Sequence, residues 1–214
     1  MAHHASDDLP PTPSGNTFIQ PLGPEEVPAA VALLARGMRD NPLHLAAYGP
    51  DERLRRARHA RLLTGRFDVA PTLALTGAFR GGVLVGVCGA APSGTCRLTT
   101  AQRLRMLPTL SRLGPAAAAH VLAWTGTWSR HDPAEPHVHL GPVGVDARLQ
   151  GRGVGTALLA HHCRRLDAEG HVGYLETDKP ENVSFYSRFG YAVVAEETVL
   201  GVANWFMVRT PSRA

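Results

Sequence analysis

Cysteine is scarce in this chain. Cys88, Cys96 and Cys163 are its three cysteines among 214 residues, and none of them has CxxC spacing. They are too few and too far apart for a disulfide framework or a zinc ribbon. We therefore expect a reducing, cytoplasmic environment and no bound metal.

Long apolar runs are also missing. No stretch reaches the roughly 18 residues that a bilayer-spanning helix needs, so we expect no membrane partner. The first residues, MAHHASDDLPPTPSGN, lack the basic and then apolar pattern of a secretory signal. They predict a flexible polar tail over residues 1–16, followed by a single folded domain over residues 17–214.

The overall charge is moderate and slightly basic. The chain is 44% hydrophobic and 19% charged, with a formal net charge of +4 and a pI of about 9.3, which suits a globular protein with a sizeable core. The densest basic run, RLRRARHAR over residues 53–61, has helical spacing but no interleaved aromatic residues. A solvated helix face is therefore favoured over a nucleic-acid surface. Positive charge also suits a phosphorylated small ligand.

Hydrophobic periodicity predicts alternating strands and helices with no internal repeat. A helical insertion, broken at Gly114-Pro115, is expected over about residues 92–136, where Trp124 and Trp128 suit packing better than a pocket. Hairpin strands followed by a strand-helix-strand unit predict one α/β domain with a mixed sheet flanked by helices. Strands are expected over residues 17–22, 72–79, 83–91, 137–145 and 172–178 and twice more near the C-terminus; helices are expected over residues 24–41, 51–65, 154–170 and 181–190.

One stretch, LGPVGVDARLQGRGVG over residues 140–155, is rich in glycine. Its second half, QGRGVG, follows an expected strand and opens an expected helix. Glycines there let backbone N–H groups converge at a helix N-terminus, which favours a phosphate. A P-loop is excluded because no Gly-Lys-Ser/Thr follows, and the glycine spacing does not fit a dinucleotide fingerprint. A tight structural turn is the alternative.

Pro142 lies inside the strand that precedes this turn. Proline has no N–H group and is confined to strand edges and bulges. With Gly141 and Gly144 beside it, the strand should bulge and part from a neighbour. The backbone of residues 143–145 would then be free to bind an extended ligand that carries amides, with its phosphates at residues 150–155.

Two segments resemble signatures of the GNAT superfamily of acyl-CoA-dependent N-acyltransferases. QGRGVG at residues 150–155 matches its Q/R-x-x-G-x-G/A pyrophosphate loop, and NVSFYSRFGY at residues 182–191 matches its N-x-x-F-Y-x-x-x-G-F/Y signature. The resemblance implies the GNAT fold: an α/β domain with a mixed, mostly antiparallel sheet of six to seven strands, flanked by helices and splayed at a bulge in the central motif strand.

The resemblance also implies a site for acetyl-CoA as cosubstrate. The backbone of Val143, Gly144 and Val145 would hold the thioester carbonyl and the pantetheine amides, and Asn182 would touch the pantetheine arm. The pyrophosphate would bind at the start of the following helix. The residues implied there are Gln150, Gly151, Arg152, Gly153, Val154, Gly155 and Thr156.

Three side chains are candidates for proton transfer. By resemblance, Tyr186 lies near the sulfur, where its hydroxyl could donate a proton to the departing thiolate; a half-buried packing role is the alternative. His139, aligned through Gln150, falls where histone-modifying members carry a base glutamate, and imidazole titrates near neutral pH. Glu176 is an acid in an otherwise apolar strand, so it could orient His139, bind the amine or pair with an arginine.

These features together predict an N-acetyltransferase. It would move the acetyl group of acetyl-CoA to a primary amine of a small molecule or peptide, by direct attack in a ternary complex. The alternative is a non-catalytic acyl-CoA-binding sensor, which would need neither Tyr186 nor His139. We expect no nucleic-acid partner, and a homodimer is compatible with the family. The variable segments 25–66 and 92–136 would shape the acceptor pocket.

Overall fold

The computed structural model describes residues 15–212 of the chain. In this part, seven strands form one sheet in the order β1-β2-β3-β4-β5-β7-β6. Neighbouring strands are antiparallel except β4 and β5, which are parallel. The predicted mixed, mostly antiparallel sheet is confirmed. The strands are β1 (Phe18–Pro21), β2 (Ala74–Arg80), β3 (Val83–Ala91), β4 (Val138–Val145), β5 (Gly173–Thr177), β6 (Ala192–Val199) and β7 (Val202–Arg209).

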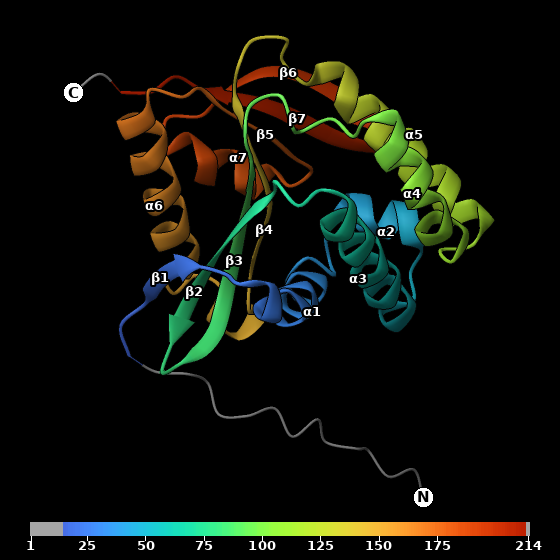
Figure 1. The fold of residues 1–214 in the computed structure, drawn as a ribbon, viewed down its shortest axis with the longest axis horizontal. Helices are drawn as coiled ribbons and strands as arrows, with labels where there is room; N and C mark the ends of the chain where they lie inside the picture. Colours follow the sequence, from blue (N-terminus) through green and yellow to red (C-terminus); the bar gives the residue numbers. More distant parts are fainter. Residues whose placement is uncertain (1–14, 213–214) are drawn as a thin grey trace, which may run out of the picture.

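Helices cover both faces of this sheet, and Figure 1 shows it running between α6 on the left and α3 to α5 on the right. One face carries the first five α-helices and the other carries α6 and α7. Short 3-10 turns lie at Pro24–Glu26 (η1) and Ala147–Leu149 (η2). The α-helices are α1 (Val27–Gly37), α2 (Pro42–Tyr48), α3 (Glu52–Val69), α4 (Thr100–Ser111), α5 (Pro115–His131), α6 (Val154–Glu169) and α7 (Pro180–Ser187).

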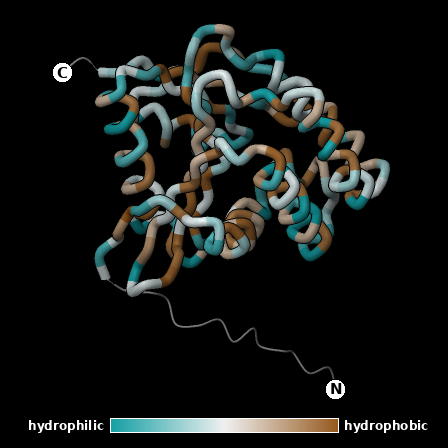
Figure 2. The backbone as a smooth tube through the Cα atoms, viewed as in Figure 1, coloured by the Kyte–Doolittle hydropathy of each residue, from teal (hydrophilic) through white to brown (hydrophobic). Residues whose placement is uncertain are grey.

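Three groups of buried side chains hold these layers together. α6 and α7 pack on the sheet through residues such as Leu159 and Met207. α1 and α3 pack on the opposite face around Leu34, and α2 and α5 pack beside β6 around Trp124. The hydrophobic residues lie along the central strands and the inner sides of the helices in Figure 2.

None of the helices formed by residues 15–212 combines the length and the hydrophobicity that crossing a bilayer requires. Most of the tail expected at residues 1–16 lies outside the described residues, so its flexibility and the domain boundary stay predictions.

The predicted helical insertion between β3 and β4 is present as α4 and α5. Thr99 begins α4 with a capping box, in which Gln102 N donates to Thr99 Oγ1 and Thr99 N donates to Gln102 Oε1. Within α5, Trp128 Nε1 donates to Asn204 Oδ1 at 3.0 Å. The contacts of Trp128, and of the buried Trp124, agree with the packing role expected for both.

Two details of the helices differ from the prediction. The helix expected over residues 24–41 ends at Gly37, and a further helix, α2, begins with Asn41 as its N-cap residue and Pro42 at its first position. The basic run of α3 is largely a solvated face, but not entirely. Arg55 and His59 are buried, and Arg55 NH1 donates to the carbonyl oxygens of residues 49 and 50. Arg55 therefore fixes the loop that precedes α3.

The predicted bulge in β4 is confirmed at Gly141-Pro142. Cys88 pairs with Val143 while Ala90 pairs with Leu140, so β4 holds one residue more than β3 across this interval. Gly89 lies opposite the extra residue. A Cβ at this position would lie 2.7 Å from the carbonyl oxygen of Gly141. Only glycine fits so close an approach, so the bulge is specified from both strands.

Candidate active site

β4 parts from β5 next to the bulge. Parallel pairing between the two strands is confined to Val138 with Gly173 and His139 with Tyr174, whereas β4 stays paired with β3 as far as Val145. Beyond residue 139, the edge of β4 that faces β5 therefore has no strand beside it among the described residues. Its amide and carbonyl groups are available to an extended ligand, because backbone polar groups need partners.

The glycine turn follows directly on this open edge. Gly151 and Gly153 have φ values of +73° and +81°, which glycine adopts without strain. Apart from chain neighbours, no atom of the described residues lies within 4 Å of a Cβ placed on either, so the turn faces open space. Ala157 N donates to the Gly153 carbonyl at 2.9 Å. The N–H groups of residues 154–156 precede this first helical bond and point out of the helix end.

Hydrogen bonds made by two of the predicted cofactor residues, Gln150 and Arg152, hold this turn in place. Gln150 is exposed, and its Nε2 lies 3.5 Å from the Gly37 carbonyl and 3.4 Å from the Val145 carbonyl, so its side chain reaches back to the ends of α1 and β4. Arg80 donates to the carbonyl of Arg152 at 2.8 Å, which fixes the loop from β2. The turn also presents the backbone N–H groups of residues 154–156 outward.

The second signature forms α7 and packs against the first. A Cβ on Gly155 would lie 3.5 Å from the ring of Phe185, so α7 meets the first turn of α6. Asn182 Nδ2 donates to Thr177 Oγ1 at 3.1 Å. Tyr186 is 7% exposed within the core, and burial raises the pKa of its phenol. Its hydroxyl therefore stays protonated at neutral pH and can serve as a proton donor.

His139 and Glu176 lie against each other on β4 and β5. His139 Nε2–H donates to Glu176 Oε2 at 2.7 Å, and the two side chains are 22% and 3% exposed. Burial lowers the pKa of His139, but the Glu176 carboxylate and hydrogen bonds with Asp132 and Cys96 outweigh it and raise the pKa well above 6.5. Of the three roles considered for Glu176, this hydrogen bond corresponds to the orientation of His139.

Four side chains converge on the other side of the His139 ring, and we call Cys96, Asp132, His137 and His139 the polar cluster. Asp132 Oδ1 lies 3.1 Å from His137 Nε2 and 3.6 Å from His139 Nδ1. Cys96 Sγ lies 3.5 Å from His137 Nε2 and 3.7 Å from Asp132 Oδ2. One donor atom from each residue lies within 4.8 Å of the others, so this set could hold a metal ion.

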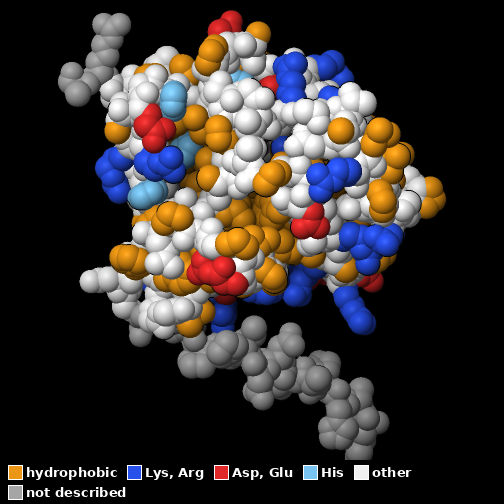
Figure 3. Space-filling model, viewed as in Figure 1, with side chains coloured by type: hydrophobic (Ala, Val, Ile, Leu, Met, Phe, Trp, Pro, Cys, Tyr) orange, Lys and Arg blue, Asp and Glu red, His pale blue; other side chains and the backbone are white. Residues whose placement is uncertain are grey.

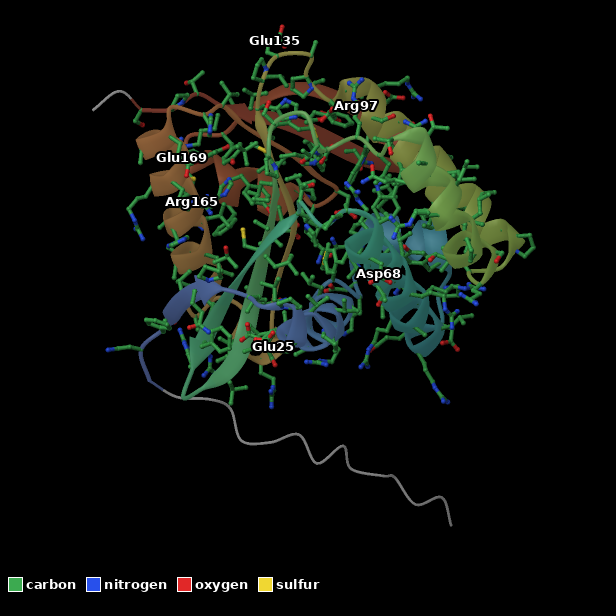
Figure 4. The ribbon with its side chains drawn as sticks, in the orientation of Figure 1. Glu25, Asp68, Arg97, Glu135, Arg165 and Glu169 are labelled. Carbon is green, nitrogen blue, oxygen red and sulfur yellow. The ribbon has the colours of Figure 1, made fainter. Side chains whose placement is uncertain are left out.

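The hydrogen bonds within and around the polar cluster shift the pKa values of its members. Arg97 Nε donates to Asp132 Oδ2 at 2.7 Å, and Figure 4 shows Arg97 beside the end of α5. Burial raises the pKa of Asp132, but bonds with His137, His139 and Arg97 hold it far below the usual value. The bond to Asp132 raises the pKa of His137, and the bond to His139 lowers that of Cys96.

Asp178 links the end of β5 to α2. Its Oδ2 accepts from Leu43 N at 2.7 Å and its Oδ1 accepts from Asn41 Nδ2 at 3.2 Å. Burial raises the pKa of Asp178 despite these bonds. The carboxyl group caps the N-terminus of α2 and holds that helix beside the open strands. Figure 3 shows hydrophobic side chains in the middle of this view of the molecule, between groups of charged ones.

Sequence reasoning missed Cys96, Asp132 and Asp178. Asp132 stands in HDPAEPHVH, where an acid and two histidines within eight residues were a usable signal. Cys96 lies 36 residues before Asp132, and only the fold of the insertion brings them together. Asp178 acts on a helix 135 residues away, so its capping role had no local signal.

Comparison with known proteins agrees with this geometry. The model of the acetyltransferase (GNAT) family matches residues 44–191, which is more than half of the chain. This range contains the open strand, the glycine turn, α7, His139 and Glu176.

Solved structures of similar fold cover almost the whole chain. One, titled as histone acetyltransferase HPA2 and related acetyltransferase from Corynebacterium glutamicum, has a TM-score of 0.70 at 22% identity and covers 92% of this chain and 98% of that chain. A polyamine N-acetyltransferase from Drosophila melanogaster has a TM-score of 0.64 at 16% identity, covering 91% and 100%. The ribosomal-protein-S18-alanine N-acetyltransferase from Escherichia coli has a TM-score of 0.55 at 14% identity, covering 93% and 96%.

The family match and the shared fold confirm the resemblance inferred from the two signatures. The chain belongs to the GNAT family and is an acyl-CoA-dependent acetyltransferase.

Proposed function

We propose that this protein transfers the acetyl group of acetyl-CoA to a primary amine of a small molecule or peptide, by direct attack within a ternary complex. The observation that carries this proposal is the open edge of β4, which ends at a glycine turn facing open space. An acyl-pantetheine arm needs backbone partners along an extended path, and its pyrophosphate needs converging N–H groups at the end of that path. This site offers both in that order.

The cofactor contacts follow from this placement. The backbone of residues 143–145 binds the thioester carbonyl and the pantetheine amides. The segment 150–156 binds the pyrophosphate at the N-terminus of α6, mainly through the N–H groups of residues 154–156, because the Arg152 N–H already donates to the Leu149 carbonyl at 3.2 Å. Asn182 lies on α7, on the opposite wall, and exchanges its bond with Thr177 for one with the pantetheine arm.

Proton transfer uses groups on both sides of the opening. The amine first releases the proton of its ammonium form to solvent, and its neutral nitrogen then attacks the thioester carbonyl. The carbon–sulfur bond breaks, and the nitrogen loses one further proton. That proton goes through water to the Glu176 carboxylate, because both ring nitrogens of His139 already face acidic groups. Tyr186 donates its hydroxyl proton to the departing thiolate and is reprotonated from solvent.

The acceptor is a primary amine that is cationic in solution. Two of the structural neighbours are titled as enzymes for amines of this kind, a polyamine N-acetyltransferase that forms N-acetylagmatine and an agmatine N-acetyltransferase. We therefore place polyamines and guanidino-amines first in an acceptor screen, and peptide N-termini second.

The test is release of free thiol from acetyl-CoA in the presence of an amine library. Amine-dependent release is expected, and acetyl-CoA should bind by calorimetry. Gly153→Glu should abolish binding, because it adds a negative charge at the pyrophosphate position and a side chain at positive φ. Unchanged affinity would contradict the phosphate site.

Matched variants separate turnover from binding. Tyr186→Phe and Glu176→Gln should each lower kcat by about 100-fold while the affinity for acetyl-CoA stays within a few-fold. Tight binding without thiol release for any amine would instead support the acyl-CoA-binding sensor.

A further inference from the structure

The polar cluster joins three separated parts of the chain. Cys96 follows β3, Asp132 caps the C-terminus of α5, and His137 and His139 lie at the start of β4. The cluster therefore ties both ends of the α4–α5 insertion to the central strand. His137 and Asp132 are buried, with side chains 4% and 6% exposed.

The hydrogen bonds of the two histidines orient lone pairs toward one point. His137 Nδ1–H donates to the carbonyl of Glu135 at 2.8 Å, and His139 Nε2–H donates to Glu176 at 2.7 Å. In neutral rings, the other nitrogens, His137 Nε2 and His139 Nδ1, then carry lone pairs. Both face Asp132 Oδ1, which is itself only an acceptor. Three acceptors that converge in this way repel one another unless a proton or a metal cation lies between them.

The spacing of these atoms fits a tetrahedral metal. Zinc bonds of about 2.0–2.3 Å at tetrahedral angles place neighbouring ligand atoms about 3.3–3.7 Å apart. His137 Nε2 lies 3.1 Å from Asp132 Oδ1 and 3.5 Å from Cys96 Sγ, and His139 Nδ1 lies 3.6 Å from the same Asp132 oxygen. One donor atom from each of the four residues lies within 4.8 Å of the others. One thiolate, one carboxylate and two imidazoles form a donor set that zinc accepts.

A catalytic triad would look different. In a Cys-His-Asp triad, the carboxylate bonds one ring nitrogen and the thiol bonds the other. Here Cys96 and Asp132 both approach the same atom, His137 Nε2, while Nδ1 is taken by a backbone carbonyl. That convergence is the geometry of ligands around an ion.

We propose that Cys96, Asp132, His137 and His139 bind one zinc ion, in a closed structural site. Each histidine has the outer partner that metal-bound histidines require, a backbone carbonyl for one and a carboxylate for the other. The charges also balance: two positive charges on the metal and one on Arg97 offset the Cys96 thiolate, Asp132 and Glu176. The site fixes the insertion to β4 and holds His139 as a positioning residue for Glu176. This zinc proposal does not depend on which amine the enzyme acetylates.

Metal content of the full chain tests this directly. Protein produced with zinc and purified without chelator should contain one zinc ion per chain by elemental analysis. Cys96→Ser and His137→Ala should lose it. Cys163→Ser is the matched control, because Cys163 is a buried cysteine in the α6 core, and it should keep the metal.

Cobalt substitution keeps the test informative if a variant folds poorly. After zinc removal, Co²⁺ added to the wild type should give the visible bands of a tetrahedral site and a near-ultraviolet thiolate charge-transfer band. Cys96→Ser should lack the latter. Chelator should lower the Tm of the wild type and leave that of Cys96→Ser unchanged. A metal-free wild type that gives no cobalt spectrum, or a Cys96→Ser variant that retains full zinc content, would overturn the proposal.

Discussion

Two groups of histidines lie on the same side of the sheet, in contrasting surroundings. The first, which we call the aromatic cluster, consists of His44, Tyr48, His59 and Trp124. The ring centroid of His44 lies 4.0 Å from the ring centroid of His59 and 5.4 Å from that of Trp124. Burial lowers the pKa of His44 to about 4 and lowers that of His59 well below 6.5. In the polar cluster, the pKa values of His137 and His139 are raised.

Burial alone does not explain the difference, because both groups are largely removed from solvent. The aromatic cluster bonds its histidines to neutral groups: His44 Nδ1 lies 2.9 Å from the Met38 carbonyl, and His59 Nδ1 lies 3.4 Å from the Tyr48 hydroxyl. The polar cluster places carboxylates on both sides of His139. A buried imidazole therefore stays neutral when its hydrogen-bond partners are neutral. When a carboxylate lies within hydrogen-bonding distance, the imidazole instead needs a cation beside it, either a proton or a metal ion.

The largest expected effect comes from removing the carboxylate that the polar histidines share. Asp132→Ala leaves His137, His139 and Arg97 without their common partner. The free energy of unfolding should fall by about 3–5 kcal/mol, because the side chains of His137 and His139 are only 4% and 22% exposed. Urea unfolding at neutral pH measures this change.

An exposed aspartate provides the control for that variant. Asp68, at the end of α3, is exposed, and Asp68→Ala should change the free energy of unfolding by about 0.5 kcal/mol or less. If Asp132→Ala cost no more than Asp68→Ala, the polar cluster would not be a bonded unit and the contrast between the two clusters would fail.

The next largest effect is the pH dependence of the aromatic cluster. His44 has a pKa of about 4 in the folded chain against 6.5 as the ordinary value. Below pH 6.5 the unfolded chain binds a proton that the folded chain does not, so stability falls as the pH drops from about 6.5 to about 4. The loss from His44 amounts to about 3 kcal/mol once the pH is below both values.

The measurement must isolate His44 from the other titratable side chains of the protein. His44→Asn keeps a donor for the Met38 carbonyl but does not titrate. The difference in unfolding free energy between wild type and His44→Asn should therefore change with pH in favour of the variant toward pH 4. A constant difference would show that His44 is not held neutral.

The sequence predicted the backbone features of the site better than its side-chain contacts. The bulge at Gly141-Pro142 and the turn at Gly151 and Gly153 were predictable, because proline and glycine restrict or permit backbone conformations locally. Hydrophobic alternation and turn residues predicted seven strands along the chain. They did not predict α2, whose start depends on a cap from Asp178, just after β5 and 135 residues away from Leu43.

The polar and aromatic clusters could not be predicted for the same physical reason. Cys96 and Asp132 meet only because α4 and α5 return the chain to the start of β4, and His44 and His59 meet only because α2 packs on α3. Neither helix packing nor loop closure leaves a periodic signal in the residues concerned. The histidines at positions 137 and 139 were singled out by strand alternation, but their partners were not.

The smallest expected effect is the loss of one hydrogen bond between uncharged groups in the aromatic cluster. Tyr48→Phe removes the hydroxyl that His59 Nδ1 meets at 3.4 Å, and Tyr191→Phe removes a matched contact of 3.3 Å to His162 Nε2. Both bonds join uncharged groups, so each variant should lose about 1 kcal/mol of unfolding free energy. The Tyr48→Phe loss should be equal at about pH 6 and about pH 8, because His59 stays neutral across that range. A Tyr48→Phe loss that grew toward low pH would mean that His59 carries charge, and the aromatic cluster would then resemble the polar one.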